Sequence, residues 1–202
     1  MTGRADAGWE MLLGLAFLVC LITVPLARGR LTRLADVELR RMWLAPLGIA
    51  IQIMIIEVVP AGTAHVHEAI HMVSYLILGA FCWSNRRIPG MPLVLLGGAL
   101  NFIAITVNGG VMPADPELAR HIAGAEGFVN SGAMKDPNLL FLGDVFATPQ
   151  SWPMYNVFSI GDITIVLGVL TLLHTVSESR LVPHRRHPRP WRHSGRRRRP
   201  RH

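Results

Sequence analysis

Apolar residues along this chain gather in long, nearly uninterrupted segments separated by polar connections. A helix needs roughly 17 to 25 predominantly apolar residues to cross the hydrocarbon layer of a bilayer. Five segments reach that length, and they cover residues 9–27, 42–59, 66–84, 91–107 and 160–176. The pattern therefore predicts an all-α fold, a polytopic membrane helix bundle with about five transmembrane helices.

The basic residues of the connections predict how this bundle is oriented. Cytoplasmic loops carry the excess of Lys and Arg. Five basic residues lie between the first two segments, two between the third and fourth, and ten from Arg180 onward. The other connections hold three, namely Arg4, Arg120 and Lys135. We therefore expect an outer N-terminus, an inner C-terminus and a long extracytoplasmic loop, residues 108–159, between the fourth and fifth helices.

Composition divides the chain into a bundle and a tail. Hydrophobic residues make up 50% of the 202 residues and charged ones 16%, a balance unusual for a soluble or disordered chain. The net charge of +7 comes from the end of the chain, so residues 1–179 are expected to form the bundle and residues 180–202 a disordered Arg-rich cytoplasmic tail. The tail is expected to attract anionic lipid head groups or to serve only as a topological anchor. No aromatic-bearing module accompanies it, so no nucleic-acid partner is expected.

The sharpest candidate for catalysis is the motif HEAIH at residues 67–71. His67 and His71 stand one helical turn apart with Glu68 between them, as the zinc ligands and general base of a zincin do. No third ligand follows at a zincin spacing. The favoured interpretation is therefore a hydrated or paired helix end, with no metal and no cofactor. A membrane-embedded zinc hydrolase is the alternative.

Polar residues approach one level of the predicted bundle from several segments. Asn101 lies about two turns before the end of the fourth segment, and Asp162 lies in the first turn of the fifth. Polar groups at such a depth are costly unless they meet each other, water or a ligand. The sequence thus indicates a polar site near the outer loop. Its ligand-binding candidates are His71, Asn101, Asn108, Asp144 and Asp162.

Some of these residues also have a purely structural interpretation. In NGGVMP, a left-handed Asn108 or Gly109 would end the fourth helix, and in SIGD, Ser159 with Asp162 three residues on would cap the fifth. Small residues on both helices predict close packing faces. These residues are Gly97, Gly98, Asn101 and Ala104 on the fourth segment, and Gly161, Thr164, Gly168 and Thr171 on the fifth.

Six ordered motifs carry a family resemblance between about Leu12 and Leu173. They are LARGRLTRLADVELR, HMVSY, NRRIPG, NFIAITVNGGVMP, FLGDVF and FSIGD. Together they resemble an uncharacterised family of bacterial multi-pass membrane proteins, the domain of unknown function 5317. The resemblance implies a location in the bacterial plasma membrane and no particular activity.

The expected function is that of a binding or accessory protein with a polar site in the outer leaflet. Its expected partners are the lipid bilayer and either another membrane protein or further copies of the chain in a homo-oligomer. A small oligomeric transporter is a third class of function, which the lack of internal repeats makes less favoured.

Overall fold

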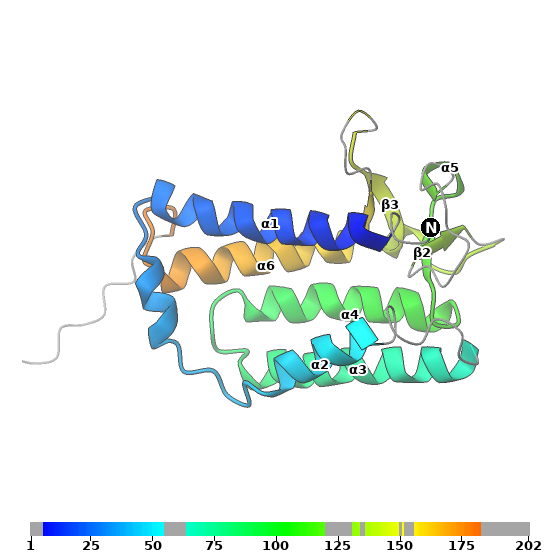
Figure 1. Cartoon of the computed structure of the whole chain (residues 1–202), viewed down its shortest axis with the longest axis horizontal. Helices are drawn as coiled ribbons and strands as arrows, with labels where there is room; N and C mark the ends of the chain where they lie inside the picture. Colours follow the sequence, from blue (N-terminus) through cyan, green and yellow to red (C-terminus); the bar gives the residue numbers. More distant parts are fainter. Residues whose placement is uncertain are drawn as a thin grey trace, which may run out of the picture.

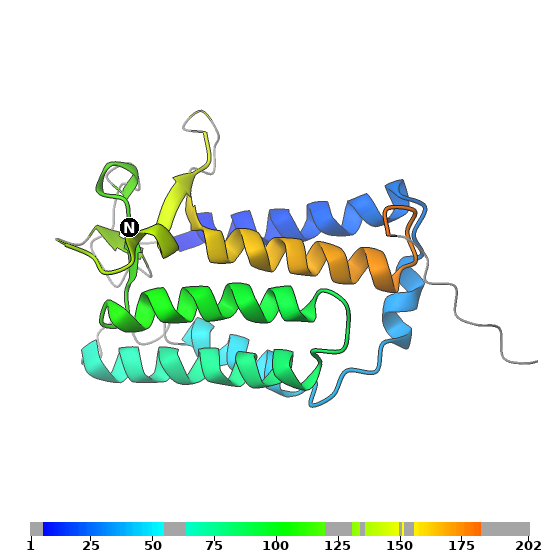
Figure 2. The same ribbon diagram turned by 180° about the vertical axis from the view of Figure 1, so that it is seen from behind.

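The computed structural model describes residues 6–54, 64–119, 131–133, 136–149, 151 and 156–182. Its α-helices are α1 (Asp6–Leu26), α2 (Leu44–Ile53), α3 (Ala64–Ser84), α4 (Met91–Val107), α5 (Pro116–Ala119) and α6 (Ile160–Val176). Two 3-10 helices, η1 (Leu31–Asp36) and η3 (Leu140–Leu142), lie in the connections. The long helices run side by side in the spatial order α1, α6, α4, α3, α2 (Figure 1 and Figure 2).

A small sheet lies at one end of the helices, next to the start of α6 (Figure 1). Its strands β1 (Met112–Ala114), β2 (Ser131–Ala133), β3 (Asp144–Ala147) and β4 (Val157–Ser159) stand in the order β2-β1-β3-β4. Strand β1 pairs in parallel with β2 and β3, and β3 pairs antiparallel with β4. Because β1 follows the end of α4 and β4 leads directly into α6, the sheet links the outgoing and incoming helices.

The prediction of an all-α, polytopic membrane bundle is wrong for the described structure. The predicted loop at residues 108–159 contributes the sheet, and none of the described helices is both long and apolar enough to span a bilayer. Helices α4 and α6 have 17 residues each. At 1.5 Å per residue they rise only about 25 Å, against roughly 30 Å of hydrocarbon. Apolar content had suggested spans, but α1 and α3, which have 21 residues each, are long without being apolar enough over the described residues, and the description of the chain as multi-pass and transmembrane is corrected accordingly.

Parts of the sequence predictions fall on residues that the structure does not describe. These include residues 55–59 of the second predicted span and residues 183–202 of the Arg-rich tail. The predicted plasma-membrane location and the lipid partners are not tested by the fold and stay predictions.

Helices α4 and α6 approach each other through glycine residues. A methyl group added at Gly97 would lie 2.5 Å from the carbonyl oxygen of Gly161, and one added at Gly168 would lie 2.9 Å from that of Gly90. Such distances leave no room for a Cβ atom, so only glycine allows the two backbones to lie so close. The packing face predicted on α4 and α6 is thus present at these positions. Gly98 takes no part, since nothing lies within 4 Å of its added methyl group.

The bundle buries polar side chains and exposes many large apolar ones. Phe17, Leu76 and Leu96 are each about half exposed or more. Large exposed apolar areas commonly mark surfaces that contact another apolar surface. The buried polar residues in the described part of the chain are His71, Ser74, Asn85, Asn101, Asn108, Asp144, Ser159, His174, Ser177 and Ser179.

Candidate functional site

The amide of Asn101 joins α4 to the first turn of α6. Its Nδ2 donates to Asp162 Oδ1 at 2.8 Å, and its Oδ1 accepts from the Ser159 hydroxyl at 2.9 Å. Asp162 Oδ2 accepts the backbone N–H of Ser159 at 2.9 Å, and Ser159 Oγ accepts that of Asp162 at 3.0 Å. The capping box predicted from SIGD is therefore present. Asn101 and Ser159 are buried, whereas the Asp162 side chain is only partly covered.

The phenol of Tyr75 on α3 lies in the same region. Burial raises the pKa of Tyr75, and the negative charges of Asp162 and Asp144 raise it further. Asp144 on β3 is buried, and its backbone pairs with Ala114 and Ser159. The phenol is protonated at neutral pH even with its ordinary pKa of 10, and the upward shift extends this to higher pH, so it can donate a hydrogen bond. Helices α3 and α6 and strand β3 thus all bring polar groups to one region.

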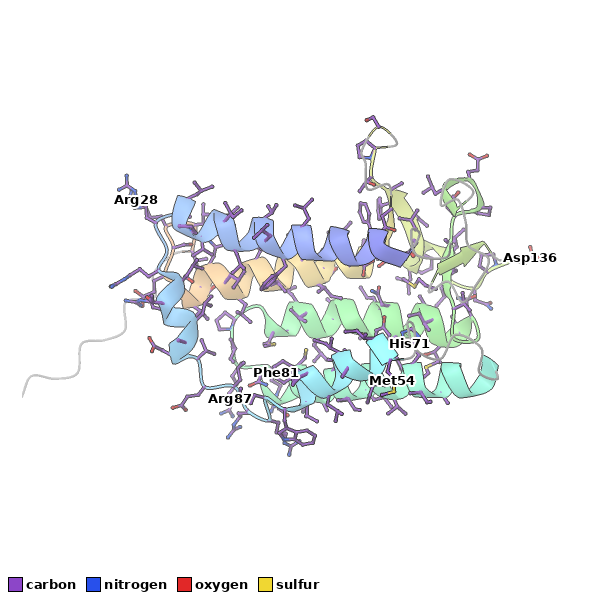
Figure 3. The ribbon with its side chains drawn as sticks, in the orientation of Figure 1. Arg28, Met54, His71, Phe81, Arg87 and Asp136 are labelled. Carbon is purple, nitrogen blue, oxygen red and sulfur yellow. The ribbon has the colours of Figure 1, made fainter. Side chains whose placement is uncertain are left out.

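His71 lies one helical turn before Tyr75, in the half of the bundle nearer the sheet (Figure 3). Its ring centroid is 5.2 Å from that of Tyr75, and the residue is 1% exposed. One ring nitrogen bonds to the backbone of Gly110, while Nδ1 is buried and finds no partner in the part of the chain that the structure describes. Burial lowers the pKa of His71, so the ring is neutral at pH 7. Since Nε2 carries the bond to Gly110, Nδ1 is left as a buried hydrogen-bond acceptor.

Six residues from three helices and the sheet therefore form one polar layer. We use this name below for the set His71, Tyr75, Asn101, Asp144, Ser159 and Asp162. Four of the five residues that the sequence predicts as ligand-binding candidates belong to it.

The fifth candidate, Asn108, is engaged in holding the chain after α4. Its Nδ2 donates to the carbonyls of Ala104 at 2.7 Å and Asn138 at 2.8 Å, and its Oδ1 accepts the Asn138 backbone N–H at 2.8 Å. Of the two residues predicted to end the helix in a left-handed conformation, Gly109 has a positive φ of 68° and Asn108 does not, and Gly110 follows with a φ of 88°. Asn108 thus fixes the loop that brings the Gly110 backbone to His71, and a ligand contact for it stays a prediction.

The zinc alternative receives no support from the described part of the chain. There, no group of three His, Cys, Asp or Glu side chains is placed to hold a metal ion. His71 is buried beside an aromatic ring, and the side chains of His67 and Glu68 lie outside the described residues. The HEAIH motif as a whole is therefore not tested.

The sequence reasoning missed the part that Tyr75 takes in the site. Its position on the polar face of α3, one turn after His71, was the available signal. Two buried residues at the far end of the bundle were missed as well. His174 contacts Thr23 at 3.1 Å and Ser179 at 2.7 Å, and the Asn85 side chain bonds to both the backbone N–H and the carbonyl of Arg40.

We expect His71 to make the stability of the protein depend on pH. Its pKa in the folded chain lies below the ordinary value of 6.5. As the pH falls through the ordinary value, His71 of the unfolded chain takes up a proton before His71 of the folded chain does. The free energy of unfolding therefore decreases. Urea unfolding followed between about pH 7.5 and about pH 5 should show this decrease, and His71→Gln should flatten it. An equal slope in the variant would contradict the assignment.

Comparison with known proteins identifies a family and a relative whose descriptions name no activity. A family model described as "Family of unknown function (DUF5317)" matches residues 36–174. An "Uncharacterized protein" from Thermotoga maritima is 29% identical over 102 residues, which cover 50% of this chain and 61% of the relative. The chain thus spans less than two thirds of that relative's length. No solved structure matches the chain.

Proposed function

Because the chain belongs to this family of unknown function, as its motifs predicted, we propose a function from the polar layer itself. The protein is a binding protein, and the polar layer takes a small ligand that carries a positively charged, hydrogen-bond-donating group. An organic ammonium ion is the simplest ligand of this class.

The observation that carries the proposal is the buried Nδ1 of His71, which has no hydrogen-bond partner among the described residues. An acceptor left unsatisfied in the interior costs about 1–3 kcal/mol. A donor supplied by a ligand or a water molecule would remove that cost, and a neutral imidazole presents only an acceptor at this nitrogen.

The charge of the polar layer favours a cation over a neutral donor. Asp162 is partly exposed, its bonds to Asn101 and Ser159 come from neutral donors, and it forms no ion pair with any described residue. Burial is the main cause of the raised pKa of Tyr75, and the negative charges of Asp162 and Asp144 raise this pKa further. The negative field of these two carboxylates stabilises a cation. The aromatic rings of Tyr75 and Phe102, whose centroids are 6.0 Å apart, can also contact a ligand cation.

Asp162→Asn tests the proposal. The purified chain is titrated by calorimetry with a series of primary and quaternary ammonium chlorides, with sodium chloride as the ionic-strength control. We expect saturable binding by the wild type and at least about tenfold weaker binding by the variant, since the amide keeps oxygen and shape but lacks the charge. The variant should remain folded, because weakening a helix cap costs only about 1 kcal/mol.

Asp115→Asn is the matched control. Asp115 also caps a helix, because its Oδ1 accepts the backbone N–H groups of Glu117 at 2.8 Å and Leu118 at 3.3 Å. This substitution should leave the affinity for ammonium ions unchanged. The proposal fails if the wild type binds none of the ammonium ions, or if both substitutions weaken binding equally.

A further inference from the structure

A second site lies at the end of the bundle opposite the sheet. A cavity of about 480 Å³ opens there between η1 and the end of α6, and this volume is within the range of small-molecule pockets. Figure 3 shows Arg28 and Arg87 at this end and Asp136 at the other. We call the cavity the η1 pocket. Its lining residues are Arg30, Thr32, Arg33, Asp36, Val37 and Val176.

The geometry of η1 aligns the charged residues of the pocket. A 3-10 helix has three residues per turn, so side chains three positions apart lie in one row along the helix. Arg30, Arg33 and Asp36 follow this spacing from the N-cap to the last residue of η1. The row therefore presents two guanidinium groups followed by one carboxylate, and all three residues line the pocket.

Hydrogen bonds hold the walls of the pocket in place. The backbone N–H of Arg30 donates to the Ser177 carbonyl at 2.8 Å, and that of Arg180 donates to the Ala27 carbonyl at 3.0 Å. Arg33 forms an ion pair with Glu178. These contacts fasten the chain before η1 to the turn after α6. A pocket whose walls are already ordered loses little conformational entropy when it binds a ligand.

The buried ring of His174 supports the same junction. Thr23 donates its hydroxyl hydrogen to the Cys20 carbonyl at 2.7 Å, so its oxygen accepts from His174 Nε2 at 3.1 Å. His174 Nδ1 then accepts from the Ser179 hydroxyl at 2.7 Å. One imidazole thus joins α1, α6 and the turn that forms the pocket wall.

We propose that the η1 pocket binds a phosphate ester of an amino alcohol, of which phosphoethanolamine is the simplest example. A guanidinium presents five N–H donors in a planar fork that suits phosphate oxygens. Arg30 forms no ion pair within the described residues, and the bond of Arg33 to Glu178 leaves donors of its fork unused. The Thr32 hydroxyl adds a further donor. Asp36 lies one 3-10 turn beyond Arg33, about 6 Å along the axis, where it can bind the ammonium group.

Phosphoethanolamine occurs both as a free metabolite and as the head group of a phospholipid. The experiment distinguishes a soluble ligand from a lipid head group. The full chain is titrated calorimetrically with phosphoethanolamine, inorganic phosphate and ethanolamine. In parallel it is mixed with phosphatidylcholine vesicles that contain or lack phosphatidylethanolamine, and bound protein is measured by flotation. Saturable binding of free phosphoethanolamine supports a soluble ligand. Binding that requires the ethanolamine lipid supports a head group.

Three variants decide whether the η1 pocket is responsible. Arg30→Ala should weaken the binding of both phosphoethanolamine and inorganic phosphate at least tenfold. Asp36→Asn should weaken the binding of phosphoethanolamine and leave the affinity for inorganic phosphate unchanged. Arg87→Ala removes an exposed arginine at the same end of the bundle that does not line the pocket, and should change neither. The proposal is overturned if no phosphate ligand or vesicle binds, or if Arg87→Ala and Arg30→Ala have equal effects.

Discussion

Gly161→Ala is expected to destabilise the protein by about 3 kcal/mol, the upper part of the usual range for overpacking a core. The added methyl group would overlap the amide of Asn101 and lie 2.8 Å from the carbonyl oxygen of Gly97. Asn101 cannot move aside without losing its bonds to Ser159 and Asp162. Helices α4 and α6 must therefore separate. Urea unfolding monitored by circular dichroism measures the change.

Gly98→Ala provides the matched control for Gly161→Ala. Gly98 is also a helical glycine, but an added methyl group there meets no atom within 4 Å. Alanine is favoured over glycine in a helix by up to about 1 kcal/mol, so this variant should be as stable as the wild type or slightly more stable. Equal losses in the two variants would show that the close contact of α4 with α6 is not the cause.

Asn101→Leu on its own should lower the free energy of unfolding by about 2–3 kcal/mol. The side chain is 6% exposed and supplies a donor to Asp162 and an acceptor to Ser159. Leucine is similar in size but leaves these groups without that partner. The midpoint of thermal unfolding and the urea free energy both measure the loss.

Thr171→Val is the control for Asn101→Leu. It removes a polar group that makes no bond between helices, so it shows how much stability the loss of any polar group costs. The Thr171 hydroxyl donates only to the Leu167 carbonyl of its own helix, so its loss should change the stability by less than about 0.5 kcal/mol. A double variant with Asn101→Leu and Asp162→Asn should lose less than the sum of the single losses, because the two residues share a hydrogen bond. Additive losses would mean that the bond contributes nothing.

Local features of the chain were readable from the sequence because they depend on neighbours within a turn. Helix α6 begins at Ile160 because Ser159 and Asp162 cap it, and α4 ends at Val107 because two glycines with positive φ follow Asn108. The glycine stripe could be recognised as a packing face, but the sequence did not show that Gly97 meets Gly161 while Gly98 meets nothing.

The prediction of transmembrane helices also depended on a local pattern, the apolar content of a window of residues. A bilayer span requires one continuous helix that is both long and apolar enough, and no described helix meets the two conditions together. Strand pairing within residues 108–159 was equally invisible, because β1 and β3 pair across about thirty residues through backbone hydrogen bonds that any side chain permits.

By itself, the sequence determined where the apolar helices lie, how α4 ends and α6 begins, and to which family the chain belongs. Only the tertiary structure decided which polar residues meet. Asn101 and Asp162 are 61 positions apart, yet they form one hydrogen bond because α4 and α6 pack backbone to backbone. Tyr75 joins them from α3, and Arg30 meets the turn after α6 at the opposite end. Contacts of this kind depend on how whole elements pack in three dimensions, which no local pattern of residues encodes.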